Sequence, residues 1–131
     1  MSQINATITD IESEGILHIV SFNASGYSLK MMSLELDREL KVGTKVLLSV
    51  KATAVAIAKD ISGVLSYSNQ LAMEIESIES GTLLSSLRLS NGSFTLDSII
   101  TKASQERMSL TPQESVTALI KSSDLSIMKS L

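Results

Sequence analysis

The chain has 131 residues, of which 44% are hydrophobic and 3% aromatic, with a formal net charge of −3 and no cysteine. The absence of cysteine excludes disulfides, zinc–thiolate sites and a cysteine nucleophile. A slightly acidic chain with few aromatic rings also argues against a nucleic-acid binder, which typically has a basic face and stacking aromatics. The hydrophobic fraction is sufficient for a packed core, which must be aliphatic.

The N-terminal residues have neither the basic start nor the apolar stretch of a signal peptide. The most apolar segment, residues 46–58, contains Lys51 and is shorter than the run of about 20 apolar residues that crosses a bilayer. We therefore expect a cytoplasmic protein with no membrane association.

In chain order, the first helical signal is at residues 33–38, and a clearer one lies at residues 101–108 with Thr101 as a plausible N-cap. Between them, residues 71–76 alternate apolar and polar side chains, which is typical of a half-buried strand. The dipeptide Asn91-Gly92 precedes another alternating stretch and predicts a hairpin. The final strands are predicted in two short segments, residues 116–120 and 125–128.

The two halves of the sequence repeat each other. Residues 8–13 match residues 75–80, and residues 50–59 match residues 120–129. The offset between the copies grows because the second copy is longer just before its fourth strand, where a loop insertion costs little. This pattern predicts one supersecondary unit that occurs twice.

Each copy contains about five short strands and one short helix, placed before the fourth strand. Regularly spaced short strands favour a small barrel, and five strands nearly close on themselves in the OB-fold. We therefore predict an all-β protein of two tandem OB-like small β-barrels, the first over residues 1–60 and the second over residues 66–131.

Three segments of the second copy follow one another in a distinctive order: Ser-Tyr-Ser-Asn-Gln-Leu at 66–71, Ile-Ile-Thr-Lys-Ala-Ser at 99–104, and Val-Thr-Ala-Leu-Ile-Lys-Ser-Ser at 116–123. Their order and spacing resemble the molybdate-binding Mop/TOBE family. The first copy resembles it more loosely, through residues 43–46 and 49–53. With two copies and no DNA-binding or ATPase domain, the chain looks like a di-domain molbindin.

This resemblance implies a non-enzymatic protein that binds molybdate or tungstate for storage or homeostasis, in pockets between neighbouring barrels of a trimer. The pocket residues carried over to this sequence are Ser66, Ser68, Asn69, Thr101, Lys121 and Ser122 from the second copy, with Lys51 and Ala52 from the first. The resemblance has gaps: Ser68 stands where the family has arginine, and Met31-Met32-Ser33 stands where the second copy has Ile100-Thr101-Lys102.

The chemistry of these residues agrees with such a ligand. Molybdate and tungstate are tetrahedral dianions whose oxygens only accept hydrogen bonds, so a pocket for them needs hydroxyls, amides and cations. Lys121 is flanked by Ser122 and Ser123, and Lys51 occupies the equivalent place in the first copy. The acidic residue nearest to Lys121 in the sequence is Asp124, three residues further on.

Simpler interpretations stand beside these. A lysine after an apolar strand is usually a solvated strand end, and serine-rich loops are usually turns. The single histidine, His18, is expected on a strand surface, and Glu74, Glu76 and Glu79 are expected on a solvated face. No nucleophile–base set or phosphate-binding glycine loop predicts an enzyme. Two other functions remain open: an oxyanion-independent interaction or regulatory module, and an OB-type nucleic-acid binder.

Overall fold

Ten strands make up most of the computed structural model, which describes every residue from Met1 to Leu131. The first half contains β1 (Ser2–Glu14), β2 (Leu17–Ala24), β3 (Tyr27–Ser33), β4 (Lys45–Val50), the 3₁₀ turn η1 (Ala52–Ala54) and β5 (Ala56–Ala58). The second half contains β6 (Asn69–Ser80), β7 (Leu84–Ser90), β8 (Thr95–Thr101), α1 (Lys102–Arg107), β9 (Ser115–Ile120), the 3₁₀ turn η2 (Ser122–Asp124) and β10 (Ser126–Ser130). No helix is long and apolar enough to cross a membrane.

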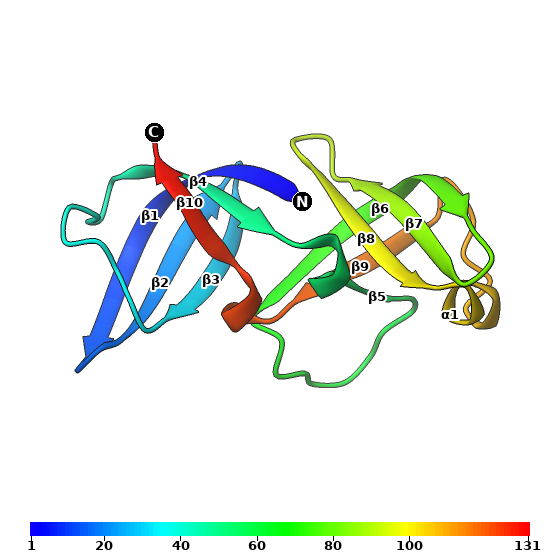
Figure 1. The fold of residues 1–131 in the computed structure, drawn as a ribbon, viewed down its shortest axis with the longest axis horizontal. Helices are drawn as coiled ribbons and strands as arrows, with labels where there is room; N and C mark the ends of the chain where they lie inside the picture. The colour runs from blue at the N-terminus through cyan, green and yellow to red at the C-terminus, as the bar shows by residue number, and fades with distance from the viewer.

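The strands form two antiparallel sheets in which the two halves exchange their last strands (Figure 1). One sheet has the order β10-β4-β1-β2-β3 and the other the order β5-β9-β6-β7-β8. The short strand β5 thus pairs with β9 of the second half, and β10 pairs with β4 of the first half. Each barrel predicted from residues 1–60 or 66–131 therefore lends its final strand to the other.

The all-β prediction is confirmed, but the sheets are open where closed barrels were expected. The first sheet ends at β3 on one side and β10 on the other, and the second ends at β8 and β5. In each sheet the two end strands are not hydrogen-bonded neighbours. An edge strand keeps unpaired backbone groups, so the open edges leave room for grooves beside them.

The two sheets have the same internal construction. β1 and β6 both begin with alternating buried and exposed side chains, as predicted for residues 71–76. Both then shift register, between Ile8 and Asp10 in β1 and between Ile75 and Ser77 in β6. A bulge re-aims the strand that carries it, and beyond this point both strands are largely exposed.

The core is continuous across both sheets. Twenty-three buried hydrophobic residues from both halves form one cluster, in which Phe22 is the only aromatic side chain. At its border Tyr27 and Phe94, which begin the equivalent strand segments of the two halves, meet edge to face with ring centroids 5.7 Å apart. The core is therefore aliphatic, as composition required, and the two halves share it.

Only one of the two predicted helices forms. α1 begins after Thr101, whose side chain accepts a hydrogen bond from the Ser104 amide, so the cap prediction is confirmed. The predicted helix at residues 33–38 was wrong, because this segment is irregular. Its side chains bind the local backbone instead: Ser33 Oγ accepts from the Glu35 amide and Asp37 Oδ1 from the Glu39 amide. Such bonds favour turns over a helix.

Candidate functional site

The strand exchange distributes the predicted site residues over two places. The turn η1, which follows Lys51, packs against β8 of the second half, and η2, which follows Lys121, packs against β3 of the first half. A buried hydrogen bond ties the first of these contacts, from Ser98 Oγ in β8 to the Val55 carbonyl at 2.6 Å. Thr101 lies three residues beyond Ser98, at the end of β8 where α1 begins (Figure 1).

We call the region between the halves the seam, where β1 contacts β8 and β6 contacts β3. One side-chain clamp crosses it at each contact. In the first, Ser2 Oγ accepts from the Asp97 amide at 2.8 Å. In the second, Asn69 binds both backbone groups of Lys30, at 2.7 and 2.9 Å. The two turns thus lie beside hydrogen-bonded contacts between the halves.

Lys51 and Lys121 have nearly the same backbone geometry. Their φ and ψ angles are −73° and 141° for Lys51, and −67° and 148° for Lys121. Each follows directly after an interior strand, β4 or β9, whose last residue is buried, Val50 or Ile120. Both lysines are exposed, and neither ammonium group makes an ion pair or a hydrogen bond within the chain. Each turn therefore offers one unpaired cation beside the seam.

The donors around the two lysines differ. Ser122 is half-buried, and no side chain caps the turn in either half. Asn69 and Ile120 are the last pair between β6 and β9, and Ser68 and Lys121 are the residues directly beyond that pair. Ala52 takes the place of Ser122 in the first half and contributes only its backbone.

Three predicted site residues have other positions or duties than expected. Asn69 is fully buried, and its amide hydrogens are donated to the Lys30 and Ile120 carbonyls. The Thr101 hydroxyl binds Ser104 as a helix cap. Ser66 is exposed in the connection between the halves. Lys121, Ser122 and Ser68 are thus the predicted residues that share one place, and Lys51 and Ala52 share the other.

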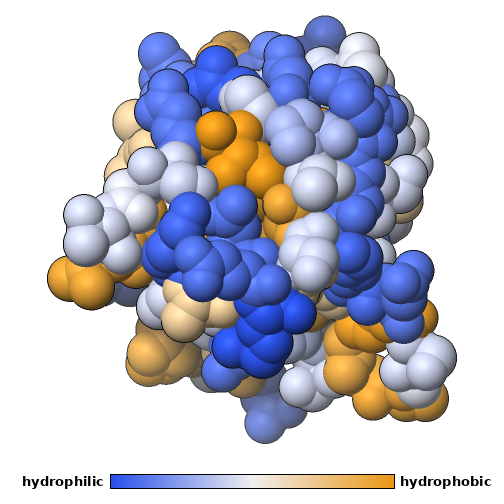
Figure 2. Space-filling model, turned by 90° about the vertical axis from the view of Figure 1, so that its right-hand side faces the viewer, coloured by the Kyte–Doolittle hydropathy of each residue, from blue (hydrophilic) through white to orange (hydrophobic).

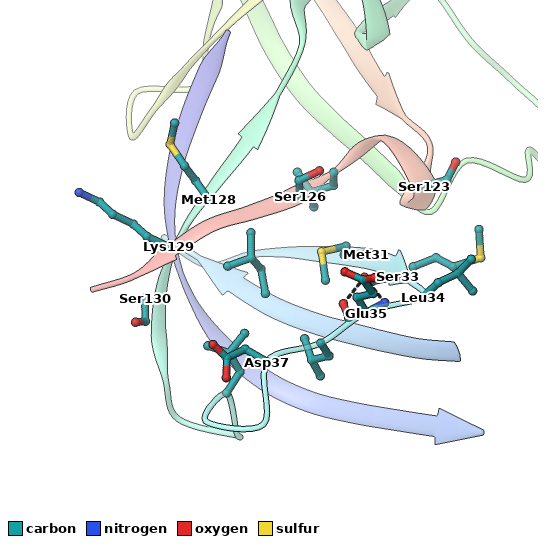
Figure 3. Close-up of a pocket in the computed structure, with 15 residues that line it drawn as sticks. Met31, Ser33, Leu34, Glu35, Asp37, Ser123, Ser126, Met128, Lys129 and Ser130 are labelled. Atoms are coloured by element: carbon teal, nitrogen blue, oxygen red, sulfur yellow. Dashed lines mark hydrogen bonds between the residues drawn. The ribbon is translucent and has the colours of Figure 1, made fainter. Parts of the chain in front are cut away.

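A groove of about 880 Å³ opens beside the Lys121 turn, between the edge strands β3 and β10 (Figure 3). Ser123 lines it at the η2 turn and Ser33 beside Glu35, while Met31 and Met128 contribute apolar surface. Lys129 lines it as a cation, but Glu35 and Asp37 line it as carboxylates. The Ser33 hydroxyl already donates to the Glu35 carbonyl, and the wall formed by residues 34–37 carries two carboxylates, so the groove itself is not suited to an anion.

Sequence reasoning missed this groove because it exists only through the strand exchange. Its two walls lie far apart in the chain, and β10 was expected to close its own half. Lys59, the first-half counterpart of Lys129, binds the Met108 carbonyl at 2.9 Å and Glu114 at 3.1 Å, both in the second half. Lys129 has no such partner. The sequence alone gave no sign that β10 pairs with β4 of the first half.

Most acidic side chains lie away from the seam, apart from Asp97 and from Asp124 in η2. Asp10, Glu12 and Glu14 lie at the far end of β1, and β6 likewise ends in an acidic stretch at the opposite end of the molecule (Figure 1). The acid nearest the first clamp, Asp97, forms an ion pair with Arg88 at 3.1 Å. Its side-chain hydrogen bond, together with its charge, raises the pKa of Arg88 above its ordinary value. The fixed negative charge near the Lys51 turn is thus balanced.

No group of three or more histidine, aspartate or glutamate side chains is placed to hold a metal cation. Glu74 and Glu76 border a smaller pocket of about 270 Å³ with Ser90 and Gln113, and both glutamates are exposed. His18 is half-exposed on β2, with its Nδ1 2.6 Å from Ser13 Oγ. These surroundings agree with the expectation that His18 lies on a strand surface and the glutamates on a solvated face.

Comparison with known proteins agrees with the resemblance found in the second half. Residues 65–127 match the family model of the TOBE domain. No curated protein matches the chain. Among solved structures, it is similar to the cytoplasmic molybdate-binding protein ModG, in a PEG-grown crystal form with molybdate bound. The TM-score is 0.91 at 27% identity, over 95% of this chain and 93% of that chain.

Proposed function

We propose that this chain binds molybdate or tungstate at the Lys51 and Lys121 turns, as a non-enzymatic cytoplasmic protein of oxyanion storage or homeostasis. The observation that carries the proposal is the pair of unpartnered lysines in matching geometry beside the seam. The similarity to a molybdate-bound protein over nearly the whole chain supports the choice of ligand.

The chemistry of the Lys121 turn suits a tetrahedral dianion. The lysine supplies a charge-assisted donor, and Ser122, Ser123 and Ser68 supply hydroxyls that can rotate toward an acceptor. The Lys51 turn supplies one cation, the Thr53 hydroxyl and backbone amides. Since molybdate and tungstate have nearly equal size and charge, the same donors serve both.

Calorimetric titration of the purified protein with molybdate, with sulfate as the control anion, tests this function. Lys121→Ala should lower molybdate affinity by about 10- to 100-fold, because a hydrogen bond to a charged group is worth about 1.5–3 kcal/mol. Lys41→Ala removes an exposed lysine in a turn away from the seam and should leave affinity unchanged. Equal affinity in Lys121→Ala and the wild type would remove Lys121 from the site.

The pocket is proposed to be completed by assembly into a trimer. The chain exposes 7661 Å² of surface, whereas a monomer of its mass exposes about 6,700 Å². Several large apolar side chains are exposed, among them Val64, Leu34 and Met128. Figure 2 shows hydrophobic residues among hydrophilic ones at one end of the molecule. Light scattering after size exclusion should give three times the chain mass of 14.0 kDa, and a monomer would contradict the trimer.

The groove favours a second candidate function, that of an interaction module indifferent to oxyanions. Its volume, its exposed apolar lining and its carboxylates Glu35 and Asp37 are features of a protein-binding surface and not of an anion pocket. Trimeric protein that gives no molybdate heat above the sulfate control would support this function over the first.

A further inference from the structure

Asn69 occupies an unusual place for an amide side chain. It is 0% exposed at the start of β6 and makes three hydrogen bonds. Oδ1 accepts from the Lys30 amide at 2.7 Å, and Nδ2 donates to the Lys30 carbonyl at 2.9 Å and the Ile120 carbonyl at 3.1 Å. One side chain therefore joins β6 to β3 of the other sheet and to the last residue of β9.

Those partners flank the Lys121 turn. Ile120 is the residue before Lys121, and Lys30 lies on β3, the strand against which η2 packs. Because both Nδ2 hydrogens are already donated within the protein, Asn69 has no donor left for a ligand. We infer that Asn69 is a positioning residue that fixes the end of β9 against β3 and so presets the Lys121 site; this inference rests on the proposed function.

The equivalent position in the first half is weaker. Ser2 is also buried, but its side chain makes a single seam contact, accepting from the Asp97 amide at 2.8 Å. It makes no side-chain bond to its strand partner Val50, the residue before Lys51. Across the seam each turn has two side-chain bonds beside it, because Ser98 also donates to the Val55 carbonyl next to the Lys51 turn. The Lys121 turn has one more, from Asn69 to the carbonyl of Ile120, the residue before the lysine. Since a site fixed in advance loses less entropy on binding, the Lys121 turn is the tighter of two unequal sites.

The experiment is a molybdate titration of the full chain. The wild type should show two classes of site, and Lys121→Ala should abolish the tighter one. Asn69→Ser, which installs the residue found at position 2, should weaken the tighter class about tenfold and leave the weaker class unchanged. In the Lys121→Ala background, Asn69→Ser should cause no further loss, because the two residues act on one site.

Ser2→Ala is the matched control and should weaken only the other class. Unchanged tight binding in folded Asn69→Ser, equal weakening of both classes, or full additivity with Lys121→Ala would overturn the inference. If Asn69→Ser does not fold, the inference is tested by comparing the wild type with Lys121→Ala. Loss of the weaker class of site in Lys121→Ala would then overturn the inference. A wild type that binds no molybdate defeats the proposed function, whereas a binding wild type with any of these results defeats the positioning role alone.

Discussion

Equivalent residues of the two halves have diverged in their partners while keeping their places. Lys59 and Lys129 occupy matching positions near the ends of the exchanged strands. Lys59 binds Glu114 at 3.1 Å and the Met108 carbonyl at 2.9 Å, whereas Lys129 lines the open groove without a partner. The contacts of Lys59 thus tie down the end of β5, whereas Lys129 leaves the groove beside β10 open.

This difference predicts unequal effects of one substitution. Lys59→Met should lower the free energy of unfolding by about 1–2 kcal/mol, because it removes a hydrogen bond to a carbonyl and leaves the half-buried Glu114 unpaired. Lys129→Met, the matched control, should change it by less than about 0.5 kcal/mol. Urea unfolding of both variants measures the effect, and equal losses would show that the Lys59 contacts add no stability.

At the scale of elements, strand signals in the sequence were reliable and the first helical signal was not. The alternation at residues 71–76 predicted β6, and Asn91-Gly92 predicted the β7–β8 hairpin. The helix predicted at residues 33–38 failed because the segment is shorter than its counterpart, and because Ser33 and Asp37 bind the local backbone. Periodicity reports which face is buried, but it does not report a competing local hydrogen bond.

The capped helix supplies a prediction at this scale. Thr101→Ala removes the acceptor for the Ser104 amide and should cost about 1 kcal/mol of stability. Thr101→Ser keeps a hydroxyl and should retain most of it. Thermal unfolding should show a decrease of about 3–6 °C for the alanine variant. A Tm unchanged by Thr101→Ala would mean that the cap does not stabilise α1.

For the whole molecule, the sequence predicted two similar units but could not predict their exchange of strands. Residues 50–59 and 120–129 are so alike that β5 and β10 can pair equally well with either half by pattern alone. Only the path of the chain through η1 and η2 decides with which half β5 and β10 pair. The predicted site was divided for the same reason, because η1 packs against β8 of the second half and η2 packs against β3 of the first half.

Strand exchange predicts that neither half folds alone. Residues 1–60 would lack β10, and residues 66–131 would lack β5, while the core is continuous across both. Each fragment by itself should lack cooperative unfolding by circular dichroism, and mixing the two should restore it. A cooperative transition in either isolated fragment would show that its half is an independent domain.

The location of the bound anion is the most direct test of the proposed site. A crystal of the protein grown with molybdate should show an anomalous molybdenum peak at the seam, with an oxygen of that molybdate within about 3 Å of the Lys121 Nζ. A second peak is expected at Lys51. A well-occupied molybdenum peak away from both turns, or none at saturating molybdate, would contradict it.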